Sequence, residues 1–467
     1  MTAEIGLIGL GTMGAALALN IVENGFETAV YNRTWSRTEE FMGSAGDLAS
    51  RLQPSESLKD FVSSLASPRN IILMVPAGKP VDDMIAQLQP LLDQNDLIID
   101  AGNANFRDSR RRAFEAKNTG QPFLGIGVSG GEEGARKGPS IMGGGEKSAW
   151  DRVAHILTAI SAKFGDTACS TYMGTDGAGH FVKTVHNGIE YADMQMIAEV
   201  YGIMRDGLGM DSAAIAAVFA RWNQGPLQSY LIEISGQVAA ATDPATGKPM
   251  LDVILDAAGQ KGTGRWTAIE ALHLAAPATT IESAVAARNL SSRLSERAQG
   301  EAIFGAAPQA VDSDGIIDLL EQALLAGKIA CYAQGFGLLR AASDEFSWDL
   351  PMSEVARVWR AGCIIRSAML DDMADALTKT PDLNLMFAPD FAHRLKESHQ
   401  GLRQVIAKAA LSGAPVPALS AALSYFDTMR TARGTANMIQ GQRDFFGAHG
   451  FVRLDDGTSE NHGPWAM

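Results

Sequence analysis

The chain has 467 residues, too many for one ordinary hydrophobic core, so two or three domains are expected. A formal net charge of -14 disfavours nucleic acid as a partner, and no apolar run reaches the roughly 18 residues that a membrane span needs. Three widely spaced cysteines argue against a disulfide framework or a zinc site, and the cytoplasm is the expected compartment.

In the first part of the chain, short apolar runs alternate with amphipathic segments. Buried strands are expected at Ile5–Gly9, Thr28–Tyr31, Ile71–Val75 and Leu97–Asp100. Ala15–Glu23 and Val81–Leu92 are predicted to be helices between these strands. Because strands that alternate with helices indicate a parallel, doubly wound sheet, residues 1–178 are predicted to form a Rossmann-like α/β domain.

The character of the sequence changes after residue 178. Long segments rich in Ala, Leu and Ile have helical spacing, for example Ala213–Trp222 and Gly315–Leu339. Residues 179–437 are therefore predicted to form a large all-α domain. Residues 438–467 lose that periodicity and contain several glycines, which predicts an irregular C-terminal tail that is either frayed or bound to another surface.

A glycine pattern, Gly9-Leu10-Gly11-Thr12-Met13-Gly14, follows the first expected strand and opens a helix. In this context glycines allow a tight turn and close approach of a pyrophosphate to the helix N-terminus. The pattern alone is weak, since it also fits an ordinary glycine-rich turn. Its place at the start of a βαβ unit favours a dinucleotide site.

The end of the second strand indicates which dinucleotide is bound. An NAD site commonly has an acid there for the ribose 2′-hydroxyl, whereas this chain has Asn32-Arg33-Thr34. A guanidinium and a hydroxyl suit a 2′-phosphate, so NADP is the expected cofactor. The alternative is that Arg33 is a solvated surface residue.

Two further segments follow expected strands, at the edge where open α/β sheets bind ligands. Asn103 follows the fourth strand, and Gly127–Gly134 follows a later short one. The glycines of the second segment would let backbone N–H groups face an anion. Plain turn chemistry explains each segment about equally well.

A polar stripe marks the helix expected at 180–191. Lys183, Asn187 and Glu190 share one face because residues four and seven apart lie close in angle, and His186 and Tyr191 flank it. The Lys183 and Glu190 backbones are about 10.5 Å apart, so their long side chains could reach different carbons of one small substrate. A polar stripe is otherwise usually a solvent-facing surface.

Together with these motifs, later segments give the chain a resemblance to the 6-phosphogluconate dehydrogenases, of the β-hydroxyacid dehydrogenase superfamily. The segments are Leu255–Trp266, Ala287–Arg288, Ala330–Gly335, Trp359–Ser367 and Gln442–His449. The resemblance spans residues 5 to about 450 and implies oxidative decarboxylation of 6-phosphogluconate to ribulose 5-phosphate, a reaction of the pentose phosphate pathway and of gluconate utilization.

The resemblance also implies residue roles, with no metal needed. Lys183 would be the general base for the C3 hydroxyl and then a proton donor to the C3 oxygen, and Glu190 the acid that protonates C1. The implied substrate-binding residues are Asn103, Ser129, Gly130, Gly131, His186, Asn187, Tyr191, Lys261, Arg288, Arg443 and His449. The implied cofactor-binding residues are Gly9, Gly11, Thr12, Met13, Gly14, Asn32, Arg33, Thr34, Val75, Ala77 and Asn103.

In the family the tail enters a neighbouring subunit, so the resemblance implies a homodimer in which Arg443 and His449 act in trans. Three positions depart from the family pattern: Gly11 stands for Ala, Pro76 for Lys and Ala104 for Ser. Pro76 removes a cation and a backbone donor near the cofactor.

Two other functions fit part of the sequence. A 3-hydroxyisobutyrate-type dehydrogenase would share the cofactor domain and the lysine, but it would not need the cations Lys261, Arg288 and Arg443. A catalytically silent NADP-binding protein would be expected to have lost Lys183 or Glu190, and both are present.

Overall fold

The computed structural model describes residues 2–312 and 314–465. The chain divides into two compact units, residues 1–422 and 423–467, and each is described by itself. Within the described residues, no helix is both long enough and apolar enough to cross a membrane.

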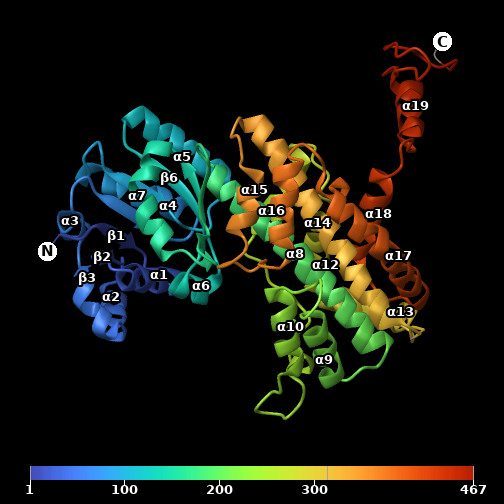
Figure 1. Cartoon of the computed structure of the whole chain (residues 1–467), viewed down its shortest axis with the longest axis horizontal. Coiled ribbons are helices and arrows are strands. Elements are labelled where there is room, and N and C mark those ends of the chain that lie inside the picture. The colour runs from blue at the N-terminus through green and yellow to red at the C-terminus, as the bar shows by residue number, and fades with distance from the viewer. Residues whose placement is uncertain (1, 313, 466–467) are drawn as a thin grey trace. The chain divides into compact units, whose positions relative to one another are not determined.

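The first unit begins with an eight-stranded sheet in the order β10-β7-β6-β5-β4-β1-β2-β3 (Figure 1). Its strands are β1 (Ile5–Ile8), β2 (Thr28–Tyr31), β3 (Leu52–Ser55), β4 (Asn70–Leu73), β5 (Leu97–Asp100), β6 (Phe123–Ser129), β7 (Ser140–Gly145) and β10 (Ser170–Gly174). Neighbouring strands are parallel except β6 and β7, which are antiparallel. The Rossmann-like α/β prediction is confirmed, while the sheet is mixed and not purely parallel.

The four expected strands are present. Thr28–Tyr31 and Leu97–Asp100 have the predicted bounds, and the ends of the other two differ by one or two residues. β3 was not predicted because Leu52–Ser55 is short, partly polar and contains Pro54. β3 is the last strand in the sheet order, and an edge strand tolerates proline because its N–H need not enter the ladder. A small hairpin, β8 (Lys163–Phe164) with β9 (Thr167–Ala168), lies outside this sheet.

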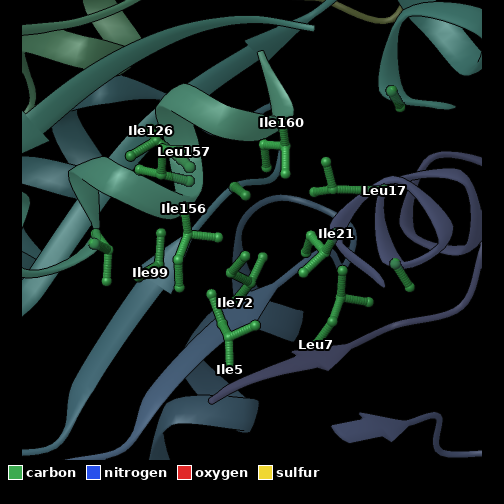
Figure 2. Packing of buried hydrophobic residues seen from close by; sticks show 14 of the residues in the cluster. Ile5, Leu7, Leu17, Ile21, Ile72, Ile99, Ile126, Ile156, Leu157 and Ile160 are labelled. Carbon is green, nitrogen blue, oxygen red and sulfur yellow. The ribbon is translucent and has the colours of Figure 1, made fainter. Parts of the chain in front are cut away.

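Helices cover the two faces of the sheet. They are α1 (Thr12–Glu23), α2 (Trp35–Ser44), α3 (Leu58–Ser63), α4 (Lys79–Leu88), α5 (Phe106–Thr119), α6 (Gly131–Lys137) and α7 (Lys147–Ile160), with short 3₁₀ turns at Gly46–Arg51 and Gln89–Leu91. Ile5 and Leu7 pack with Leu17, Ile21 and Ile156 in one hydrophobic cluster (Figure 2).

The next residue of β1, Ile8, belongs to a second cluster, together with Phe61 and Val81. Successive side chains of a strand point to opposite faces, so both faces of the sheet are apolar and both are buried.

The rest of the first unit is helical. Its helices are α8 (Ala178–Gly202), α9 (Ser212–Trp222), α10 (Tyr230–Ala240), α11 (Thr263–His273), α12 (Thr279–Ser291), α13 (Leu294–Phe304), α14 (Ile316–Phe346), α15 (Met352–Val358), α16 (Met369–Lys379) and α17 (Pro389–Ser412). The boundary between the two units falls within α18 (Pro417–Met429). A single π-turn, Ile203–Gly207, extends α8, and 3₁₀ turns lie at Met250–Asp252 and Leu385–Phe387. α8 and α14 are mostly buried and pack against each other, which makes them the core of the helical part.

The second unit contains α19 (Ala436–Gly447), so the prediction of an irregular tail from residue 438 is wrong for its first turns. The helix lacks a buried apolar face of its own, which explains why its periodicity was missed. Beyond the helix the chain folds back on the carboxylate of Asp444. This carboxylate accepts hydrogen bonds from the amides of Gly450 and Gly463 and from Trp465 Nε1, at 2.8–3.0 Å.

Candidate active site

The polar stripe on α8 lies against strand β6, and two glycines of that strand allow the close approach. A Cβ atom on Gly127 would lie 2.5 Å from Lys183 Cβ, and one on Gly125 would lie 2.8 Å from His180 Nδ1. Side chains at these positions would push the helix away from the sheet. The alternating glycines of β6 therefore hold Lys183 close to the edge where β6 ends.

The Lys183 amine is buried in a closed ring of hydrogen bonds. Lys183 Nζ donates to Ser129 Oγ at 3.0 Å and to Asn187 Oδ1 at 2.6 Å. His186 joins the same two side chains, with Nδ1 2.9 Å from Asn187 Oδ1 and Nε2 3.4 Å from Ser129 Oγ. Asn187 Nδ2 donates to Thr263 Oγ1 at 2.9 Å, which fixes the amide so that its oxygen faces Lys183.

Burial controls the protonation of this cluster. It lowers the pKa of Lys183 from its usual range, against the attraction of Glu190. It also raises the pKa of Glu190, with Lys183 and Arg288 acting in the opposite sense. For His186, burial and the neighbouring Lys183 hold the pKa well below its ordinary value, so this imidazole is neutral. Each shift favours an uncharged form, because a charge in a dry site loses its hydration.

A second group of predicted residues lies further along α8. The guanidinium of Arg288 lies over the Tyr191 ring, 3.6 Å from its centroid, and donates to Gly259 O and Met194 Sδ. Lys261 is exposed on the turn before α11, two residues from Thr263. The guanidinium of Arg288 thus lies at one end of the stripe, and the amine of Lys183 lies at the other.

The glycine turn has the geometry that its sequence predicts. Gly9 has a φ of +103°, and its Cβ would lie 2.4 Å from Met74 O, so only glycine fits there. Gly11 lies at the N-terminus of α1 with open space around it, so the departure from Ala changes no packing. Asn32 Oδ1 accepts the Leu10 N–H at 3.1 Å and ties the end of β2 to this turn.

The remaining cofactor candidates lie on neighbouring strand ends. Arg33 and Thr34 are exposed after β2, and Thr34 directly precedes α2. Val75 and Ala77 follow β4 and are half-buried, Pro76 between them is exposed, and Asn103 is exposed after β5. Thr12 and Met13 form the first turn of α1.

Ser129, Gly130 and Gly131 form the turn between β6 and α6. A Cβ on Gly130, whose φ is +113°, would lie 2.6 Å from Gly362 O, so the Trp359–Ser367 segment packs directly behind this turn. Sequence reasoning did not name Thr263 and Met194. The sequence around Thr263 does not indicate that its hydroxyl orients Asn187. The sequence around Met194 does not indicate that its sulfur contacts Arg288.

Arg443 and His449 lie in the second unit, on α19 and just beyond it. Both are exposed, and Arg443 Nη1 donates to Gln440 Oε1 at 3.0 Å. No group of three or more His, Cys, Asp or Glu side chains in residues 2–312 and 314–465 is arranged to hold a metal ion.

A glycine turn at the carboxyl edge of a Rossmann-like sheet, together with a buried amine and a carboxyl group on one helix, is typical of a dinucleotide-dependent dehydrogenase. Residues 4–174 match the NAD binding domain of 6-phosphogluconate dehydrogenase, and residues 179–465 match the C-terminal domain of the same enzyme. The chain belongs to the 6-phosphogluconate dehydrogenase family and is a decarboxylating oxidoreductase.

Relatives are similar over nearly the whole chain. An NADP(+)-dependent decarboxylating 6-phosphogluconate dehydrogenase of Bacillus subtilis is 48% identical over 456 residues, 97% of either chain. An NAD(+)-dependent enzyme of the same organism is 46% identical over 460 residues, 97% of this chain and 98% of that one. The solved structure of Plasmodium falciparum 6-phosphogluconate dehydrogenase superposes with a TM-score of 0.96 at 40% identity, covering 99% of this chain and 100% of that one.

Proposed function

We propose that this enzyme oxidises 6-phosphogluconate at C3 and decarboxylates it to ribulose 5-phosphate and carbon dioxide, with reduction of NADP, as a step of the pentose phosphate pathway. The observation that carries the proposal is that Lys183 and Glu190 lie on one helix face, with the pKa of the amine lowered and the pKa of the carboxyl group raised. The Plasmodium falciparum enzyme, which is described with its cofactor NADP+ and its substrate 6-phosphogluconate, supports the choice of ligands.

Lys183 is the proposed general base. A neutral amine has two N–H bonds, and Ser129 Oγ and Asn187 Oδ1 can accept both of them. The nitrogen lone pair is then left to accept the proton of the C3 hydroxyl. The glycine turn after β1 would hold NADP, and its nicotinamide would supply the acceptor for the hydride of C3. The ammonium formed on Lys183 can then donate to the C3 carbonyl oxygen and stabilise the negative charge that develops there as carbon dioxide leaves.

Glu190 is the proposed acid that protonates the enediol formed when carbon dioxide leaves. The carbon that receives the proton is C2 of 6-phosphogluconate, which becomes C1 of ribulose 5-phosphate. Its carboxyl lies one helical turn beyond His186, with Oε2 3.8 Å from His186 Nδ1. Because burial raises its pKa, a larger fraction of Glu190 carries a proton near neutral pH than an exposed glutamate would. A carboxylic acid and an amine thus divide the two proton transfers between them.

The remaining polar groups are proposed to bind the substrate. Asn103, Ser129, Gly130, Gly131, His186 and Asn187 would hold its carboxylate and hydroxyls, and Tyr191, Lys261, Arg288, Arg443 and His449 its phosphate. A guanidinium offers a bidentate fork to phosphate, and an ammonium offers a point charge. The stacking of Arg288 on Tyr191 supports this assignment because it orients the fork.

A homodimer is part of the proposal, with Arg443 and His449 reaching the partner's site. The second unit carries large apolar side chains that its own fold leaves in solvent. Phe445, Phe446 and Leu454 are 70%, 73% and 83% exposed. Clustered apolar exposure of this extent is typical of a surface that a partner covers.

The cofactor preference is tested at Arg33, since the Bacillus subtilis relatives include both an NADP-linked and an NAD-linked enzyme. We expect Arg33→Ala to raise the KM for NADP roughly 30-fold, because a charge-assisted hydrogen bond to a phosphate contributes about 2 kcal/mol. The KM for NAD, which lacks the 2′-phosphate, should change less than threefold. Steady-state kinetics with both cofactors measure the two values. Equal losses for NADP and NAD would remove Arg33 from the 2′-phosphate site.

The overall reaction is tested by turnover of the purified enzyme. We expect 6-phosphogluconate and NADP to give NADPH and carbon dioxide in a one-to-one ratio, measured by absorbance and by gas release. 3-Hydroxyisobutyrate should not be oxidised at a comparable rate, because a substrate without phosphate leaves Lys261 and Arg288 unused. A folded enzyme that turns over 6-phosphogluconate with neither NADP nor NAD would refute the proposal.

A further inference from the structure

The turn that carries Asn103 is held by hydrogen bonds on both sides of Gly102. The Gly102 N–H donates to Asp100 Oδ1 at 3.1 Å, and the Gly102 carbonyl accepts from His180 Nε2 at 3.1 Å. A Cβ on Gly102 would lie 2.9 Å from Val75 O, so the turns after β4 and β5 touch through their backbones. Asn103 therefore projects from a turn whose preceding residue is fixed by three neighbours.

The buried guanidinium of Arg112 connects the turns after β4 and β5. Arg112 of α5 is 2% exposed and donates from Nη1 to Asp100 Oδ2 and from Nη2 to Gly78 O, both at 3.0 Å. Its Nε donates to Asp82 Oδ1 at 2.8 Å. A single side chain thus bonds to the turn after β4, to the start of α4 and to the end of β5.

His180 connects this assembly to the helix that carries Lys183. It lies in the first turn of α8, three residues before Lys183, and it is buried. Burial lowers the pKa of His180, so the ring is neutral. A carbonyl can only accept, so Nε2 carries the proton, and Nδ1 accepts from Ser109 Oγ at 2.7 Å. Both nitrogens are used inside the protein, which leaves neither of them for substrate.

We propose that His180 is a positioning residue, which with Asp100 and Arg112 forms a buried frame that sets the Asn103 turn relative to Lys183. The proposal rests on the proposed function in one respect: Asn103 is taken to contact both cofactor and substrate. Through the frame, the two turns on the cofactor side and the helix on the substrate side keep one fixed geometry. His180 thus acts on the reaction through Asn103 and does not touch the reacting atoms.

The test is a double-mutant cycle between His180→Leu and Asn103→Ala. Alone, His180→Leu should lower kcat/KM roughly tenfold, because it leaves the buried Gly102 carbonyl without its donor. In the Asn103→Ala background the same change should cost less than about threefold, since residues that act through one another are not additive. His180→Gln, which can still offer an amide N–H to Gly102, should recover most of the activity.

Two measurements separate this proposal from the proposed function and from simple loss of stability. The same cycle is run on the dissociation constant of NADPH, which needs no turnover, so a wild-type enzyme inactive on 6-phosphogluconate still tests the frame. Thr184→Val, buried one turn further along α8, removes the hydrogen bond from Thr184 Oγ1 to His180 O and should lower the melting temperature without changing NADPH binding. The proposal would be overturned if the effects of His180→Leu and Asn103→Ala were additive in both kcat/KM and the dissociation constant of NADPH. It would also be overturned if His180→Leu and His180→Gln lost the same activity.

Discussion

Lys183→Met is expected to lower kcat roughly 1000-fold or more, because a positioned general base contributes about 10² to 10⁴ and no other amine of the described residues joins the ring of Ser129, His186 and Asn187. Binding of 6-phosphogluconate should persist, since the proposed phosphate-binding cations remain in place. NADPH formation measures the first effect, and titration calorimetry the second.

The stability of this variant should move in the opposite direction from its activity. Folding buries Lys183 and lowers its pKa, so at neutral pH the folded state disfavours a charge that the unfolded chain carries freely. Met removes that penalty, while Ser129 and Asn187 keep His186 as a partner. The melting temperature should therefore rise or stay equal. Lys183→Arg is the control for charge: it retains a cation that does not lose its proton, so it too should be inactive. An active Arg variant would exclude the role of a base.

The glycine turn could be predicted because its signal is local. The glycine spacing, the strand before it and the helix after it occupy a continuous stretch, and the positive φ of Gly9 follows from that spacing. β3 could not be predicted in the same way, because its pairing with β2 is what makes Leu52–Ser55 a strand. The neighbouring strand, and not the intrinsic β-propensity of these residues, determines their structure.

The helix that carries the polar stripe, α8, was predictable only in part. The helical period places Lys183, Asn187 and Glu190 on one face, but it does not say whether that face is buried. Burial comes from the glycines of β6 and from Thr263, which lie 55 or more residues away in sequence from the side chains they contact. The roles of Arg443 and His449 remain predictions, because they depend on the arrangement of two chains.

Glu190→Gln is expected to lower kcat at least roughly 100-fold and to remove the alkaline fall of the pH profile of kcat/KM. The proposed mechanism requires a neutral Lys183 and a protonated Glu190. The requirement for neutral Lys183 makes the rate rise with pH, and the requirement for protonated Glu190 makes it fall at high pH. The lowered pKa of Lys183 and the raised pKa of Glu190 enlarge the fraction of enzyme with both forms near neutral pH.

The fall of kcat/KM at high pH does not depend on which of the two groups, Lys183 or Glu190, loses its proton first. If Glu190 loses its proton before Lys183 does, the two requirements cancel between the two pKa values and the rate is flat there, but it still falls above both. Removing the carboxyl therefore removes the fall in either order, and the Glu190→Gln rate should rise to a plateau that persists at high pH.

Glu199→Gln provides the matched control, since Glu199 is another glutamate of α8 and its burial raises its pKa to about 7. Its carboxylate accepts the amides of Ala418 and Leu419 at 2.8 and 2.9 Å, at the start of α18. Its replacement should alter the pH dependence of the melting temperature and leave the alkaline fall of kcat/KM in place. If Glu199→Gln abolished that fall and Glu190→Gln retained it, the proton for C1 would have to come from a group other than Glu190.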